Sequence, residues 1–562
     1  MRRKHVLSLL MLSMGVALLI AATTVGVASS ATQKAGSAKA LKGGVLKVNQ
    51  SAGSFDTLDP GLAYVTNDWE VLYSTGLNLV NFPNKAGQAG SQLFPEAAKA
   101  FPTISKNGKT VTFHLRSGLK FSDGSPVTAA AYQRAWERIL SPHMYAQYGI
   151  FDQLNKMVVG ADAFTKKGGP AHISGISAKG LTLTFHLVKP NPTFVSILGM
   201  QWFNAVKPSM PYWSKSSSGV LKYPSAGPYY IASNSPGREV VLKRNPHWKS
   251  IPQIQANPNQ IVIQSFPNSN GEASLLQIEK NQVDFDMAGI PADDVAKVSS
   301  QYGGPNKGQF HVGSQSCILW EAFNNAKAPT NNANVRKALN YAIGRTPIIK
   351  LLGPYAGTSS DQILVPGLPG YKKFSAYGNY PNFGKARAVG GAALHGAAPL
   401  NIYYNQASAF RTNEAEFMQR QLQAIGLTAK LEPSDPQDYY GPLETKGTDY
   451  NIAHSGWCAD YFDPFDFINV NFDGRSIQQT GNVDYFYFNN SSFNKQMDAA
   501  ASKSGAARAS AYAALDKTLM TKYAPAFPLY VPTFRYLTAK RVKNVVYSNY
   551  FGYPILNAMS VG

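Results

Sequence analysis

Residues 454–464 read His454-Ser455-Gly456-Trp457-Cys458-Ala459-Asp460-Tyr461-Phe462-Asp463-Pro464. The stretch holds one of the two cysteines in this 562-residue chain, and the other is Cys317. An even pair of cysteines in an exported chain indicates one long-range disulfide, because a zinc site usually needs four protein ligands, or three and a water. A tryptophan and an aspartate beside such a bridge are suited to a rigid ligand site. A core tryptophan next to a solvated aspartate is the more common arrangement, and spacing alone does not separate the two.

The N-terminus has the layout of an export signal. Met1-Arg2-Arg3-Lys4 is followed by an apolar run from Val6 to about Val27 and then by small residues. We expect residues 1–31 to be a signal peptide, or an uncleaved anchor because the run is long for a signal, and residues 32–42 to be a linker. The sequence therefore predicts an extracytoplasmic protein, in the periplasm or at the cell surface.

The composition is typical of a folded protein with more than one domain, since 562 residues exceed what one hydrophobic core supports. Hydrophobic residues make up 44% of the chain and charged residues only 15%. Lys and Arg outnumber Asp and Glu by 53 to 32, which gives a formal net charge of +21. Because these basic residues are scattered and form no run of five, we predict no nucleic-acid binding.

Helical and strand patterns alternate along the chain. Lys106-Asn107-Gly108-Lys109 predicts a hairpin turn, and segments 227–231 and 239–246 predict a second hairpin. The clearest amphipathic helix is expected from Arg411 to Ile425, and a short strand from Asp449 to Ala453 leads into the quoted stretch. This interleaving predicts a mixed α/β, or α+β, protein.

No catalytic signature is present. The nine histidines are scattered, without a His-Glu-x-x-His motif, and there is no Gly-x-Ser-x-Gly elbow. Close carboxylate pairs are candidates for glycoside hydrolysis, but they more often cap turns or lie on a solvated surface. These pairs are Asp284 with Asp286, Asp293 with Asp294, and Asp460 with Asp463. We therefore predict a binding protein that is not an enzyme and that has no metal site and no cofactor.

A series of short motifs, in order from about residue 43 to the C-terminus, resembles the extracytoplasmic solute-binding proteins of peptide-class (oligopeptide/dipeptide) ABC importers. The motif Trp457-Cys458-Ala459-Asp460-Tyr461 resembles the oligopeptide-binding branch in particular. The other matching pieces are Gly43-Gly44-Val45-Leu46, Leu58-Asp59-Pro60, Phe121-Ser122-Asp123-Gly124, Gly227-Pro228-Tyr229, Arg244-Asn245-Pro246 and Phe323-Asn324-Asn325.

The resemblance implies a periplasmic-binding-protein-like fold of type II, with two lobes, a hinge between them and an extra inserted domain. It implies domain I from residues 43–84, 222–316 and 531–562, an inserted domain II from residues 85–221, and domain III from residues 317–530.

The resemblance also assigns roles in a ligand site. It implies a disulfide between Cys317 and Cys458, and it makes Asp460 the receptor for the α-ammonium group of a peptide. Gly456 would let the ligand backbone approach closely, and main-chain groups nearby would pair with an extended peptide as with an added strand. The neighbours that complete this part of the predicted site are Trp457, Cys458 and Tyr461.

Two further residues are candidates for ligand contact. His454 lies where some relatives have an arginine, so it is a candidate partner for a ligand carboxylate, with a surface histidine at a strand end as the alternative. Tyr148 resembles a cleft-facing residue of the same branch. Two departures from the branch stand out: the apolar N-terminal run ends without a lipidation cysteine, and Gly61-Leu62-Ala63-Tyr64 lacks the acidic residue that some peptide binders have there.

The predicted function is capture of a short peptide by closure of the lobes and its delivery to the transmembrane subunits of an ABC permease. We expect a monomer that is peripheral to the membrane or wall. One alternative is the same scaffold binding another solute, such as a glycan fragment, an opine or a metal chelate. The other is a secreted hydrolase of wall peptides.

Overall fold

The computed structural model describes residues 43–51, 55, 57–144, 154–212, 219–266, 271–435 and 438–562. The predicted signal peptide and linker lie outside the described residues. None of the helices within these ranges is long and apolar enough to cross a membrane.

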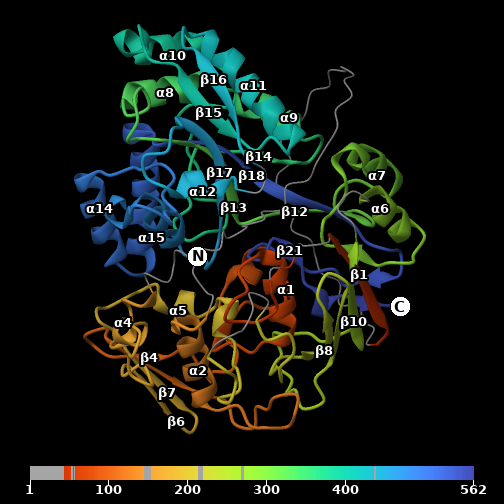
Figure 1. Cartoon of the computed structure of the whole chain (residues 1–562). Helices are drawn as coiled ribbons and strands as arrows, with labels where there is room; N and C mark the ends of the chain where they lie inside the picture. The colour runs from red at the N-terminus through yellow and green to blue at the C-terminus, as the bar shows by residue number, and fades with distance from the viewer. Residues whose placement is uncertain are drawn as a thin grey trace.

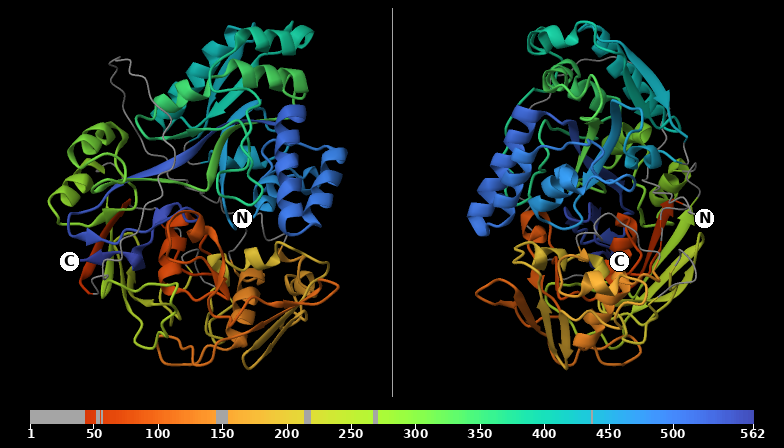
Figure 2. Two further views of the ribbon diagram at one scale, coloured as in Figure 1. Left: turned by 180° about the vertical axis from the view of Figure 1, so that it is seen from behind. Right: turned by 60° about the vertical axis from the view of Figure 1, so that its left-hand side comes forward.

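We call residues 43–309 and 538–562 the first lobe and residues 310–537 the second lobe, because the main sheets divide the chain in this way. Figure 1 shows the second lobe above the first, and the C-terminus returns to lie beside β1 in the first lobe. Figure 2 shows the same arrangement from two other directions. The predicted domain boundaries at 316/317 and 530/531 fall between β12 and β13 and within β18, and they stay predictions.

The larger sheet of the first lobe has five strands in the order β11-β1-β10-β9-β8. β1 pairs in parallel with β10 and β11, while β8 and β9 form the antiparallel hairpin that the sequence predicts. The strands are β1 (Val45–Ser51), β8 (Tyr229–Ser235), β9 (Glu239–Arg244), β10 (Gln260–Phe266) and β11 (Phe285–Asp286), accompanied by helices α1 (Thr66–Thr75), α6 (Gly271–Glu279) and α7 (Val295–Gln301).

The smaller sheet of the first lobe has four strands in the order β4-β5-β7-β6. They are β4 (Thr103–Ile104), β5 (Thr110–His114), β6 (Ile176–Lys179) and β7 (Thr182–His186). Alternate residues of β5 and β7 are buried, and α2 (Ala129–Leu140) packs against β6 and β7. The predicted turn at residues 106–109 joins β4 to β5, so this hairpin is confirmed.

A buried ion pair fixes the backbone around Asp59. Asp59 accepts two hydrogen bonds from the guanidinium of Arg138 on α2, at 2.7 and 2.8 Å, and both side chains are almost fully buried. The Asp59 carboxylate also accepts from the backbone N–H groups of Gly61 and Val220. A buried charge with this many partners is compensated, so the loop leading to Tyr64 has one fixed course.

The second lobe is built on a seven-stranded sheet with the order β12-β18-β13-β17-β15-β16, and β14 pairs with β18. Helices α8 and α11 pack on one face of this sheet, and α13, α14 and α15 share the main core on the other face. The strands are β12 (Phe310–Ser314), β13 (Cys317–Phe323), β14 (Gly357–Ser359), β15 (Leu400–Tyr404), β16 (Ala429–Pro433), β17 (Ile452–Cys458) and β18 (Ala526–Leu537). The main helices are α8 (Ala333–Ala342), α9 (Arg345–Lys350), α10 (Phe383–Gly390), α11 (Ala409–Gln423), α13 (Pro464–Phe472), α14 (Ser491–Ala501) and α15 (Gly505–Thr518).

One predicted element is displaced. The strand expected from Asp449 to Ala453 begins instead at Ile452 and continues to Cys458, so Trp457 and Cys458 belong to β17. The alternating pattern is lost at this strand because Ile452, Ala453, His454 and Ser455 are all buried, on both faces of the sheet. The predicted helix at 411–425 is confirmed as α11, which starts and ends two residues earlier.

The disulfide closes the pairing of β13 with β17. Cys317 and Cys458 are direct cross-strand partners with their Cα atoms 4.0 Å apart, and their sulfurs are bonded, so this predicted bridge is confirmed. The close approach is that of an antiparallel pair at a site without backbone hydrogen bonds. The bridge spans 141 residues of sequence and therefore constrains most of the second lobe in the unfolded chain.

Replacing both cysteines by serine should lower the free energy of unfolding by about 2–5 kcal/mol, because the unfolded chain regains the freedom that the bridge removes. Urea unfolding of the ligand-free protein, monitored by tryptophan fluorescence, measures this difference. Wild-type protein unfolded with and without a thiol reductant is the matched control. Equal unfolding midpoints in the variant and the oxidised wild type would show that the bridge does not stabilise the lobe.

Candidate functional site

The candidate site lies in the loop of residues 459–463, between the end of β17 and the start of α13. Asp463 caps α13 by accepting from the Phe465 backbone N–H, and it forms an ion pair of 2.8 Å with Arg508 of α15. Asp466, in the first turn of α13, accepts from the backbone N–H of Asp460 at 2.9 Å. These contacts hold the backbone of Asp460 in place from its C-terminal side.

Asp460 itself lies at the contact between the lobes. Its carboxylate accepts from the hydroxyl of Tyr64 in the first lobe at 3.2 Å, and its carbonyl accepts from the hydroxyl of Tyr550, also of the first lobe, at 2.7 Å. The residue is only 8% exposed, and none of the ion pairs found among the described residues includes it. Burial raises the pKa of Asp460 to about 7, and the hydrogen bond from Tyr64 offsets only part of that effect.

Aromatic residues hold Tyr64 in position. Its ring stacks on Trp202 at 5.5 Å and meets Trp69 edge to face at 6.4 Å. The indole N–H groups of Trp69 and Trp202 both donate to the carbonyl of Ala63, the residue before Tyr64. The tyrosine is therefore a preorganised donor that faces the second lobe.

The other predicted residues of the quoted stretch lie around this loop. Trp457 is half-buried against the main core, Cys458 is bridged, and Tyr461 is fully buried. A Cβ atom added to Gly456 would lie 2.4 Å from Cδ2 of Leu319 on β13, so the glycine is needed for strand packing. Direct ligand contact by these residues stays a prediction, and Tyr148 lies outside the described residues.

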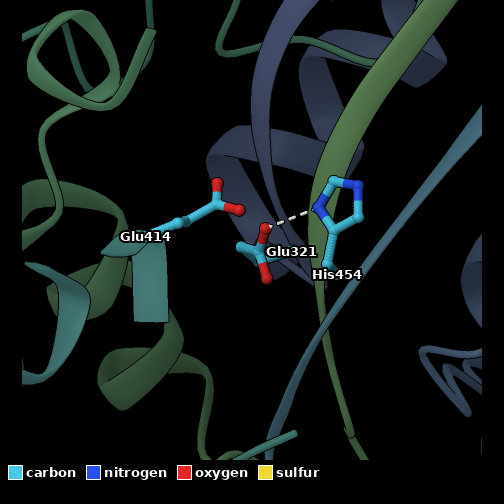
Figure 3. A group of neighbouring side chains, drawn as sticks. All are labelled: Glu321, Glu414 and His454. Atoms are coloured by element: carbon cyan, nitrogen blue, oxygen red, sulfur yellow. Dashed lines mark hydrogen bonds and ion pairs between the residues drawn. The ribbon is translucent and has the colours of Figure 1, made fainter. Parts of the chain in front are cut away.

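His454 is not at the surface, so the alternative of a surface histidine at a strand end is wrong. It is 4% exposed and lies within β17, directly opposite Glu321 of β13. Its Nδ1 atom is 2.9 Å from Oε1 of Glu321, and Glu414 of α11 points toward the same pair (Figure 3). Burial lowers the pKa of His454 well below its usual value, and the guanidinium of Arg411 lowers it further, so the imidazole is neutral.

Most of the described fold falls within a match to a known protein family. Residues 92–509 match the family model described as bacterial extracellular solute-binding proteins, family 5 Middle. The chain belongs to this family. The recognition made from sequence motifs is thereby confirmed, and the family's extracellular setting agrees with the predicted extracytoplasmic location.

Relatives of this family 5 solute-binding protein carry names from peptide uptake. The chain is 24% identical over 439 residues to the oligopeptide-binding protein OppA of Bacillus subtilis, which covers 76% of this chain and 77% of the relative. The solved structure of the clavulanic acid biosynthesis oligopeptide binding protein 2 is similar with a TM-score of 0.83 and 20% identity, over 93% of this chain and 96% of that one. OppA of Haemophilus influenzae, solved with the peptide RPPGFSPFR, gives a TM-score of 0.70 at 21% identity, over 93% and 99% of the two chains. The predicted fold, of type II and periplasmic-binding-protein-like, is confirmed by these structures.

Two of the three predicted carboxylate pairs of this family 5 protein have structural partners, whereas Asp293 is exposed and Asp294 partly exposed, as expected for a solvated surface. Asp463 is a helix cap, as expected, and the buried Asp284 forms an ion pair with the partly exposed Arg541 at 2.6 Å. Asp284, Asp286, Asp460 and Asp463 are all buried, so the interpretation of these residues as solvated surface is wrong.

Sequence reasoning missed the residues that contact the predicted site residues. Tyr64, Tyr550 and Asp466 contact Asp460, and Arg508 pairs with Asp463. Glu321 and Glu414 lie beside His454. One signal was available for Glu321. It lies four residues after Cys317 and His454 lies four residues before Cys458, so the predicted bridge between antiparallel strands already places the two side chains opposite each other.

The pKa of Asp460 predicts how pH acts on the empty protein. With the lobes apart the carboxyl would be solvated and would have its usual pKa of 3.8, whereas burial between the lobes raises its pKa to about 7. Closure of the empty protein is therefore most favourable below pH 4 and becomes less favourable as the pH rises to 7, because the open form releases the proton first. Small-angle X-ray scattering of ligand-free protein should give a larger radius of gyration at pH 7.5 than at pH 4. This dependence should be weaker in Asp460→Asn, and the same dependence in both proteins would contradict this role of the carboxyl.

Proposed function

We propose that this family 5 protein captures short peptides between its lobes, with Asp460 receiving the α-ammonium group, and delivers them to the transmembrane subunits of an ABC permease. The observation that carries the proposal is a buried carboxylate at the contact between the lobes, with a hydroxyl donor and no cation in the described part of the chain. An ammonium ion supplies the missing charge. The peptide ligand is also supported by the names of the relatives.

The geometry of β17 supports recognition of an extended main chain. β13 pairs with β17 along its whole length, but β15 pairs with it only at Ile452 and Ala453. From His454 to Cys458 the second edge of β17 therefore has no strand partner among the described strands. A peptide that adds to this edge gains main-chain hydrogen bonds that do not depend on its side chains, which fits a binder of varied sequences.

In the proposed function, closure of the two lobes over the ligand connects ligand binding with delivery to the permease. The lobes contact each other through Tyr64 and Asp460, through Phe82 and Phe462, and through Arg508, which donates to Thr193 at 2.7 Å. A ligand shifts the population toward the closed form only by the difference between its affinities for the two forms. Because the ammonium–carboxylate pair is completed in the water-excluded closed form, it supplies such a difference.

The remaining parts of the proposal concern the state of the protein in the cell. We propose that residues 1–31 act as the export signal, that the protein is a monomer peripheral to the membrane or wall, and that it has no enzymatic activity. Native mass spectrometry of the purified protein, which reports both copurified ligand and oligomeric state, tests whether the protein is a monomer.

Asp460→Asn tests the proposed role directly, because it keeps the size of the side chain and removes its charge. We expect the Kd for a free-amine tetrapeptide to rise by roughly 30-fold to several thousand-fold, equal to about 2–5 kcal/mol for loss of a desolvated charge partner. Isothermal titration calorimetry measures this change. N-acetylation of the peptide should weaken binding to the wild type by a similar factor and have little further effect on the variant.

Asp286→Asn is the matched control. Asp286 is also buried, and its carboxylate accepts from the hydroxyl of Ser274 and the backbone N–H of Ala288, both in the first lobe, while no hydrogen bond or ion pair found among the described residues joins this carboxylate to the second lobe. An unchanged Kd in Asp460→Asn, or an equal loss in both variants, would remove Asp460 from its assigned role.

The two alternatives give different results. Titration with glycan fragments, opines and metal chelates beside mixed peptides separates the non-peptide solutes, since the protein should bind only its own class tightly. Incubation with labelled wall peptides followed by product analysis tests the hydrolase alternative, because a binding protein returns the peptide intact.

A further inference from the structure

Three side chains from three separate elements converge inside the second lobe, away from the contact between the lobes. Glu321 comes from β13, His454 from β17 and Glu414 from α11, and each offers one ligand atom within 4.8 Å of the others. All three residues are buried, with exposures of 1%, 4% and 1%. Figure 3 shows the two carboxylates and the imidazole directed toward a common point.

One oxygen of this cluster is unpartnered. Glu414 pairs with Arg411 through its Oε2 atom, but its Oε1 atom is buried and has no hydrogen-bond partner in the part of the chain that the structure describes. A buried carboxylate oxygen without a partner is costly, and native proteins rarely leave one without a ligand, ion or water. The carboxyl group of Glu414 points toward Glu321 and His454, so a bound ion at their midpoint would satisfy it.

The charges of the cluster also leave room for a cation. Arg411 pairs with Glu414, and among the ion pairs of the described residues Glu321 faces only the imidazole of His454, so the two carboxylates have one arginine between them. A metal ion would supply a further positive charge.

We propose that Glu321, Glu414 and His454 form a structural site for a divalent transition-metal ion of the zinc type. A neutral imidazole and carboxylate oxygens are ligands that zinc accepts, with water in a fourth position. Calcium and magnesium are less suited, since both prefer sets made only of oxygen ligands.

The surroundings fit a structural ion. Arg411 forms an ion pair with the Oε2 atom of Glu414 and would be an outer-shell partner of the ion. The hydroxyl of Tyr439 donates to the carbonyl of His454 at 2.7 Å. Apolar residues of α8, α11 and the sheet form a buried core in the same lobe. An ion here would fasten α11 to β13 and β17, and it would be taken up as the exported chain folds. The proposed peptide edge uses the main chain of β17 from His454 onward, whereas this site uses the imidazole of His454, which faces Glu321 and Glu414.

Metal binding by the full-length mature protein tests the proposal. We expect protein stripped with EDTA and incubated with ZnCl2 to retain one zinc per chain after gel filtration, measured by elemental analysis. Zinc should also raise the Tm of the stripped protein by a few degrees, because the ion binds the folded state. Cobalt in place of zinc should give visible absorption bands that report nitrogen and oxygen ligands.

Two variants remove ligands in different ways. His454→Gln leaves the pair of Glu414 and Arg411 intact, while Glu414→Gln removes the unpartnered oxygen, and each should weaken zinc binding more than about 100-fold, since outer-shell losses alone cost 10–100-fold. Circular dichroism confirms folding of each variant.

His172→Gln is the matched control, because His172 also contacts one glutamate, Glu137, at 2.9 Å but lacks a second carboxylate. It should keep full zinc binding, as should Asp460→Asn, which separates this site from the peptide site. Absence of retained zinc in the wild type would show that the cluster is a buried ion-pair network completed by a proton. Equal zinc retention in the wild type and both ligand variants would place the ion elsewhere, and either result overturns the proposal.

Discussion

The antiparallel pairing of β13 with β17 is the constraint on which the rest of the second lobe depends. The bridge between Cys317 and Cys458 lies at one end of this pairing, so the register of the two strands is fixed covalently. A slip of one residue would turn every side chain to the other face of the sheet. With the register fixed, Glu321 must face His454, and the chain must leave the sheet at Ala459, next to the first lobe.

Because the chain leaves the sheet next to the first lobe, Asp460 lies at the contact between the lobes. The backbone of Asp460 is held by Asp466 on one side and by the bridged Cys458 on the other, which keeps this residue at the contact between the lobes. Burial of a carboxylate without a cation is unfavourable, and burial raises the pKa of Asp460 for the same reason. Because Asp460 is held at the contact between the lobes, closure without a ligand is unfavourable. In the proposed function, a cationic ligand that pairs with this carboxylate stabilises the closed form.

Sequence reasoning reached the parts of this site that are local. The bridge, the helix α11 and the hairpins follow from residue patterns or from the resemblance, and they are confirmed. Tyr64 could not be placed in the same way, because 396 residues separate it from Asp460 and only the assembled lobes bring the two together. The end of the predicted strand at Ala453 was wrong because burial on both faces removes the alternation on which strand prediction relies.

The polar residues of α11 illustrate a second limit. An amphipathic helix is expected to place its charged residues in solvent, yet Arg411 and Glu414 are each no more than 2% exposed and face the sheet. Nothing in the helix pattern distinguishes these two from the exposed charges around them, because the reason for their burial lies on β13 and β17.

Buried acid-base chemistry lies within β17, at His454, and in the loop just after it, at Asp460, with opposite compensation. In the proposed function the positive charge that pairs with Asp460 comes from the ligand, since Tyr64 and Tyr550 offer only hydroxyl groups. Near His454 the chain itself supplies an arginine, Arg411, which pairs with Glu414. A binding protein needs this difference, because its ligand must be released at the permease while the lobe that holds it keeps its shape. The proposed ligand contact just after β17 therefore has no cation among the described residues, whereas the part of the strand that faces α11 has Arg411 nearby.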